Sequence, residues 1–143
     1  MAGATLLYFD FAGYLGRDAF SGKVASADWF GVARMEDFRI ALAAEGRLTA
    51  QPVAGAAIWG ILWMLPAESL PWLDDHFGVA QGHARRTTAR VVSPAGPRTE
   101  AMVYLPTGTA AAGKVAPDRA AIVAAARALR FPAAYLAELA ALA

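Results

Sequence analysis

Short apolar runs with a period of two dominate the first two thirds of the chain. Phe38, Ile40 and Leu42 alternate with Arg39 and Ala41, and this alternation is typical of β-strands. Strands are predicted at residues 5–9, 29–35, 38–42, 57–65, 83–92 and 99–105, with a further extended piece between residues 46 and 52. A short break is expected at residues 36–37, between the second and third of these strands.

Helix signals appear later in the chain. A short helix is predicted after Ser69, with a proline in its first turn and Gly78 at its end; these are common capping residues. Two more helices are predicted at residues 117–130 and 133–142, separated by Pro132, which cannot continue a helix. Strands followed by a helical tail indicate an α+β fold. We expect one domain, residues 1–143, built as a small mixed β-barrel or curved sheet with flanking helices on one side.

The strand at residues 57–65 is apolar on both faces. Trp59, Ile61 and Trp63 share one face, and Ile58 and Leu62 lie on the other. Such a strand is either buried on both sides or in contact with a partner, which leaves a homodimer open. A glycine inside it, residue 60, predicts a bulge or a close approach of another backbone.

Charge and composition narrow the functional classes. The formal net charge of +1 provides no global field for nucleic acid or anionic membranes. The chain contains no cysteine, which excludes disulfides, thiolate catalysis and zinc–thiolate sites. The longest apolar run, between Pro52 and Pro66, is shorter than a membrane span, and the first residues do not resemble a signal peptide. We therefore expect a soluble, cytoplasmic protein that binds neither nucleic acid nor membranes.

Several segments match a family pattern in order. Residues 8–15 read YFDFAGYL, residues 58–65 read IWGILWML, and residues 73–79 read LDDHFGV. They resemble the Y-F-x-Y-G-S-N-L, V-x-G-x-L-Y-x-L and L-D-x-x-E-G-V motifs of gamma-glutamylcyclotransferases. Further similarities lie at residues 33–42, 82–86, 101–104 and 132–135. No single motif is specific, but the ordered set covers most of the chain.

The resemblance implies a fold, a reaction and a pocket. In that family the α-amine of a gamma-glutamyl group attacks the side-chain carbonyl and releases 5-oxoproline, and a glutamate takes the proton of the amine. No cofactor or metal is expected. Carried over position by position, the residues that would bind the substrate are Phe11, Ala12, Gly13, Tyr14, Leu15, Phe77, Ala84 and Tyr135.

Three of these positions depart from the family pattern. Phe77 stands where the motif has its glutamate and can neither accept nor donate a proton. Ala12, Gly13 and Tyr14 replace the Gly-Ser-Asn of the loop, whose backbone N–H groups bind the substrate carboxylate in the family. Ala84 replaces a tyrosine. These changes predict a more apolar, aromatic pocket without ordinary cyclotransferase activity.

Other groups are weak candidates for the missing base. His76 and Asp74 lie in the same motif, and His83 lies beyond the turn. Adjacent helix residues point about 100° apart, so His76 is not expected to replace the glutamate at position 77. Asp74 is expected to support the helix, Asp75 to be solvated, and these spacings match no metal motif. Three functions stay open: a pseudoenzyme that binds a small molecule or partner, an active enzyme with a substitute base, and a structural subunit in which Tyr14 and Phe77 fill the pocket.

Overall fold

The computed structural model describes residues 4–11, 27–42, 48–82, 84–93, 98–106 and 119–141. In chain order these residues form β1 (Thr5–Asp10), β2 (Asp28–Leu42), β3 (Leu48–Pro66), the 3-10 turn η2 (Ala67–Ser69), α1 (Leu70–Phe77), β4 (Ala84–Val92), β5 (Arg98–Pro106), α2 (Arg119–Ala128) and α3 (Ala133–Ala141). The prediction of an α+β fold with a curved sheet and flanking helices is confirmed.

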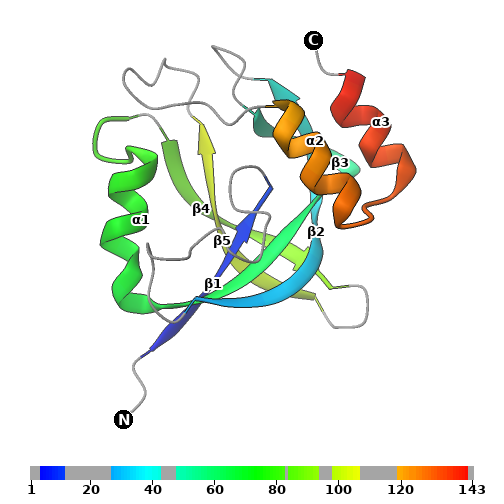
Figure 1. Ribbon diagram of the computed structural model, residues 1–143. Coiled ribbons are helices and arrows are strands. Elements are labelled where there is room, and N and C mark those ends of the chain that lie inside the picture. Colours follow the sequence, from blue (N-terminus) through cyan, green and yellow to red (C-terminus); the bar gives the residue numbers. More distant parts are fainter. Residues whose placement is uncertain are drawn as a thin grey trace.

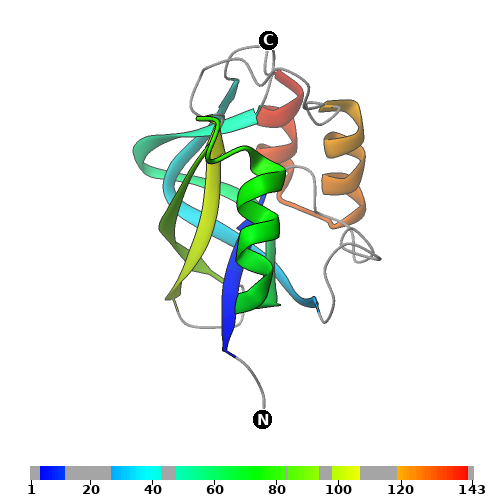
Figure 2. The same ribbon diagram turned by 90° about the vertical axis from the view of Figure 1, so that its left-hand side faces the viewer.

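The strands form a closed barrel in the order β1-β3-β2-β4-β5. Neighbouring strands are antiparallel except β1 and β5, which pair in parallel where Tyr8 lies beside Met102. Figures 1 and 2 show α1 apart from the α2–α3 pair, so the helices flank the barrel at two places. The expectation that all helices lie on one side is therefore wrong.

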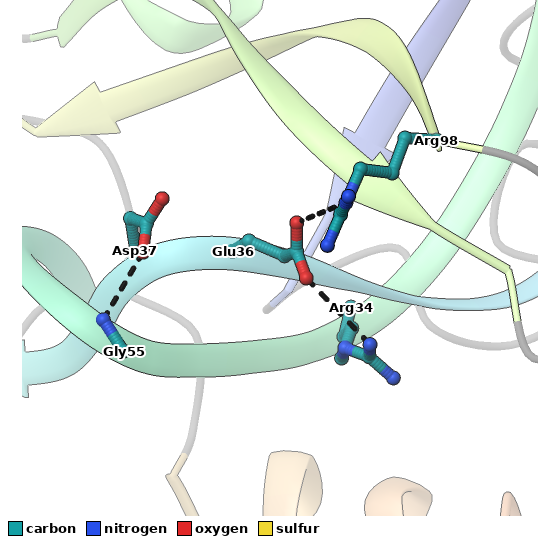
Figure 3. Close-up of polar contacts among 5 residues, drawn as sticks. All are labelled: Arg34, Glu36, Asp37, Gly55 and Arg98. Carbon is teal, nitrogen blue, oxygen red and sulfur yellow. Dashed lines mark hydrogen bonds and ion pairs between the residues drawn. The ribbon is translucent and has the colours of Figure 1, made fainter.

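Two strands are longer than predicted because the expected interruptions are bulges. The register of β2 against β3 shifts between Glu36 and Phe38, and Asp37 between them has a φ of 65°. The backbone N–H of Gly55 donates a 3.0 Å hydrogen bond to Oδ1 of Asp37, as Figure 3 shows. Since an aspartate tolerates positive φ and accepts this bond, β2 bends here without ending.

Both faces of β3 are covered by other elements of the chain. The side chains of Ile58 and Leu62 are buried, and so are those of Ile61 and Trp63 on the opposite face. The ring of Trp59 lies 6.1 Å from that of Phe131, which precedes α3. The core thus continues from the barrel interior to the surface under the helices, which is the first of the two alternatives that the apolar pattern of this strand left open.

Gly60 marks a close approach between β3 and β1. A Cβ atom at this position would overlap the carbonyl oxygen of Asp10 and lie 2.8 Å from Cζ of Phe9. The prediction of a close backbone approach is confirmed, and only glycine lets the end of β1 pack this tightly against β3.

Helix α1 begins and ends close to its predicted bounds. A proline lies in its first turn, and Gly78 ends it in the left-handed conformation with a φ of 73°. Ser69 occupies the N-cap position, but its side chain makes no capping hydrogen bond, so that detail of the prediction is wrong. None of the described helices is long and apolar enough to cross a membrane.

Candidate functional site

The Asp74 side chain connects helix α1 to the barrel by hydrogen bonds. Oδ1 of Asp74 accepts a 2.6 Å hydrogen bond from the Tyr104 hydroxyl on β5, and Oδ2 accepts a 2.6 Å bond from Nη1 of Arg86 on β4. Tyr104 and Arg86 lie opposite one another in the β4–β5 pair, so both donors point toward the helix. Asp74 therefore has the anchoring position expected of it, and it sets the face that α1 turns to the sheet.

Phe77, one helical turn beyond Asp74, reaches the same face of the barrel. Its ring is stacked on Tyr104 with the centroids 4.4 Å apart and 14° between the planes. The Tyr8 ring of β1 lies 6.2 Å from Phe77 and 5.9 Å from Tyr104. We call Tyr8, Phe77 and Tyr104 the aromatic cluster. Two of its rings are almost fully buried, and that of Phe77 is only partly buried.

The chemistry of Tyr104 is set by this position. Burial, followed by the hydrogen bond to Asp74, raises the pKa of its hydroxyl well above the usual value near 10. The group therefore stays protonated at every physiological pH and remains a donor. Its role in the described structure is to hold α1 through Asp74, while its ring supports Phe77.

A second carboxylate, which our sequence reasoning missed, lies beside the aromatic cluster. Asp10 is the last residue of β1, has only 5% of its surface exposed, and accepts a 2.6 Å hydrogen bond from the Tyr8 hydroxyl. The signal was present in the chain: a period of two places residues 8 and 10 on one face of the strand. The predicted strand ends at residue 9, so the prediction did not pair Asp10 with Tyr8.

The other polar residues of α1 that the sequence analysis considered, His76 and Asp75, lie at the surface. His76 is exposed, and its ring is stacked on Trp72 at 5.0 Å with 7° between the planes. It meets Phe77 only edge-on, at 5.1 Å. Asp75 is exposed as well. Within the described part of the chain, no three acidic or histidine side chains converge as metal ligands.

The predicted pocket wall is only partly described. Phe11 is buried with its ring 6.5 Å from Phe9, and Ala84 is buried at the start of β4. Tyr135 lies in α3, with its ring 6.0 Å from Phe131 in a second aromatic group. The predicted residues Ala12, Gly13, Tyr14, Leu15 and His83 lie outside the described residues. A contact between Phe77 and Tyr14, our proposed sign of a filled pocket, is therefore not part of the described structure.

Tyr135 is buried, and its hydroxyl lacks a hydrogen-bond partner among the described residues. Burial, followed by the nearby carboxylate of Glu138, raises the pKa of Tyr135. The backbone of Trp59 acts in the opposite direction, and the buried Tyr135 hydroxyl makes no hydrogen bond of good geometry with the described residues. The geometry favours a packing role for this side chain, and its predicted role in binding substrate stays a prediction.

The part of the chain that contains α1 is similar to a known protein family. The model of the AIG2-like family matches residues 57–139, from the middle of β3 to α3. This chain belongs to the AIG2-like family. No curated protein matches the sequence. The matched range contains α1, Asp74, Phe77 and Tyr104, so the anchored helix belongs to the family's part of the chain.

Solved structures place this AIG2-like protein on the gamma-glutamylcyclotransferase fold. One described as a gamma-glutamyl cyclotransferase is 21% identical, with a TM-score of 0.79 over 98% of this chain and 89% of that one. The human uncharacterized protein loc79017 is 22% identical, with a TM-score of 0.77 over 97% and 88% of the two chains. YkqA from Bacillus subtilis has a TM-score of 0.75 at 18% identity, with 53% of its length covered. The resemblance inferred from the motifs is thus confirmed for family and fold.

Proposed function

We propose that this AIG2-like protein does not carry out ordinary gamma-glutamyl cyclotransfer and instead binds a small ligand beside α1. The observation that carries the proposal is the Phe77 ring stacked 4.4 Å from Tyr104, at the position where the cyclotransferase motif has its glutamate. Cyclisation needs a group that takes a proton from the attacking amine. A phenyl ring cannot do this, and losing a general base typically lowers rates by about 10²–10⁴-fold.

The two candidate substitutes on α1 are poorly suited to that task. Both oxygens of Asp74 already accept 2.6 Å bonds, from a phenol and a guanidinium. Breaking either bond would loosen the helix that carries the site. His76 is exposed and stacked on Trp72. These contacts favour a supporting role for Asp74 and a surface role for His76.

A binding role is favoured by what the site retains. The anchor between Asp74, Tyr104 and Arg86 still holds α1 against the barrel. Phe77 keeps part of its surface exposed above the buried rings of Tyr8 and Tyr104. Partly exposed aromatic surface with a few polar groups nearby is typical of small-molecule sites. We therefore expect specific binding without turnover.

The test compares release of 5-oxoproline from gamma-glutamyl amines and dipeptides by the wild type, Phe77→Glu and Phe77→Gln. The two variants match in size, and only Glu supplies a base. We expect no release by the wild type or by Phe77→Gln, and measurable release by Phe77→Glu. Thermal shift with the same compounds measures binding to the wild type. Release by the wild type would overturn the proposal, and a wild type whose melting temperature no compound changes would favour a structural subunit.

A further inference from the structure

Strand β4 is paired along its whole length on one edge only. On that edge it pairs with β5 from Ala84 to Val92. On its other edge only Val91 and Val92 pair, with two residues of β2. Within the described part of the chain, residues 84–90 therefore have no strand beside them on that edge. Backbone N–H and C=O groups along an unpaired edge are available to pair with an added strand.

The bulge in β2 explains why this edge stays open. A regular continuation of the pairing between β2 and β4 would place Glu36 beside Arg90. Instead, β2 bends at Asp37, whose carboxylate accepts the hydrogen bond from Gly55 (Figure 3), and from Phe38 onward it pairs with β3. Figure 1 shows β2 and β4 separating from the point where they pair.

The open edge carries positive charge. Strand β4 reads ARRTTARVV, with three arginines and no acidic residue. Arg86 is bound to Asp74 of α1. Arg85 and Arg90 are exposed, and neither forms an ion pair with another described residue, although Glu100 lies opposite Arg90 in β5. The edge therefore combines backbone groups without a strand partner and two exposed cations.

From this edge and its charges we propose that residues 84–90 of β4 dock an extended, acidic segment of a partner protein as an added strand. In this mode of recognition, backbone hydrogen bonds supply affinity and side chains at alternate positions supply specificity. A second copy of the chain fits less well, because pairing two β4 edges brings arginines together, and like charges on paired strands are destabilising. An acidic segment turns the same charges into an attraction.

The two exposed arginines specify the spacing of the acidic residues in that segment. Arg85 and Arg90 are five positions apart, so their side chains lie on opposite faces of the strand. Side chains that are paired across two strands lie on the same face. Two acidic residues five positions apart, one near each end of the segment, therefore lie beside Arg85 and Arg90. Thr87 and Thr88 between them favour β-branched residues in the middle of the segment.

The test titrates the peptide acetyl-Thr-Glu-Val-Thr-Val-Thr-Glu-Thr-amide into the isotope-labelled full chain and follows its amide signals by NMR. A second peptide has glutamine in place of both glutamates. We expect the acidic peptide to bind about tenfold more tightly, the effect of two exposed ion pairs. It should also slow the hydrogen exchange of amides within residues 84–90. A third peptide, methylated on its backbone nitrogens, keeps both charges and should not bind.

Two variants test the role of the charges. The double substitution Arg85→Gln and Arg90→Gln should abolish the preference for the acidic peptide, because it leaves the backbone of the edge in place and removes its unpaired charges. Arg127→Gln removes a charge from an exposed position of α2 and should keep the preference.

Each other outcome contradicts one part of the proposal. Equal binding of the acidic and glutamine peptides by the wild type, or no binding, overturns it without any variant. Binding of the methylated peptide as tightly as the acidic one overturns strand addition, and amide changes confined to residues outside β4 overturn the placement. Self-association of the chain through the same amides would show that a second copy occupies the edge and would overturn the acidic partner. None of these outcomes bears on release of 5-oxoproline, so the proposed function is tested separately.

Discussion

The hydroxyl of Tyr104 should contribute measurably to the stability of the chain. Tyr104→Phe removes the 2.6 Å bond to Asp74 and leaves the ring stacked on Phe77. A hydrogen bond to a charged acceptor is worth about 1.5–3 kcal/mol. The Asp74 side chain is 30% exposed, so water can replace part of the lost bond. We therefore expect a loss of about 1–2 kcal/mol in the free energy of unfolding.

At this chain length, such a loss lowers the melting temperature by roughly 4 °C per kcal/mol. Calorimetry and urea unfolding followed by tryptophan fluorescence measure it independently. Arg86→Gln is the matched comparison, since it removes the guanidinium that forms the ion pair with Asp74. The Arg86 side chain is 38% exposed, and exposed ion pairs contribute about 0–1 kcal/mol. Tyr104→Phe should therefore be the more harmful of the two.

A double-mutant cycle with Asp74→Ala isolates the interaction. If the bond between Tyr104 and Asp74 holds α1, the two substitutions should be less than additive by about 1 kcal/mol. Additive effects within about 0.3–0.5 kcal/mol would refute the reasoning, because they would mean that the two groups stabilise the fold independently. A Tyr104→Phe protein as stable as the wild type would refute it as well.

Three further predictions follow from the described contacts. Gly60→Ala should lower the free energy of unfolding by about 1–3 kcal/mol in urea titrations, because its Cβ would overlap the carbonyl of Asp10; an unchanged midpoint would contradict the close packing. The pKa values of Tyr104 and Tyr135 are raised in the folded state, so the two hydroxyl groups contribute fully to the free energy of unfolding below about pH 10, and this contribution is lost as the pH rises further. The free energy of unfolding measured in urea should therefore fall above about pH 10, and it should fall less steeply in Tyr104→Phe. Glu36→Gln breaks the ion pairs with two arginines shown in Figure 3 and should cost at most about 1 kcal/mol, an effect that 1 M salt should largely abolish; a salt-independent cost would point to another role for this side chain.

The local elements were largely readable from the sequence. Gly78 ends α1 because only a residue that tolerates the left-handed conformation can do so cheaply. Gly60 indicated a close approach because it lacks a Cβ atom. The prediction that Phe77 replaces the glutamate of the family motif depended only on the residues around it, LDDHFGV. Each of these inferences depends on the intrinsic properties of one residue or on its near neighbours.

The tertiary structure decided which distant groups meet. Asp74 lies 12 residues from Arg86 and 30 from Tyr104, and only the placement of α1 on the β4–β5 pair joins them. The break expected at residues 36–37 is a bulge because β3 continues alongside β2 and supplies the Gly55 N–H to Asp37. The sequence by itself determined the kinds of element, and it places a phenylalanine at position 77 in the segment that resembles the cyclotransferase motif. Closure of the barrel determined the site, because hydrogen bonds and ring contacts between remote strands depend on distances that no local pattern encodes.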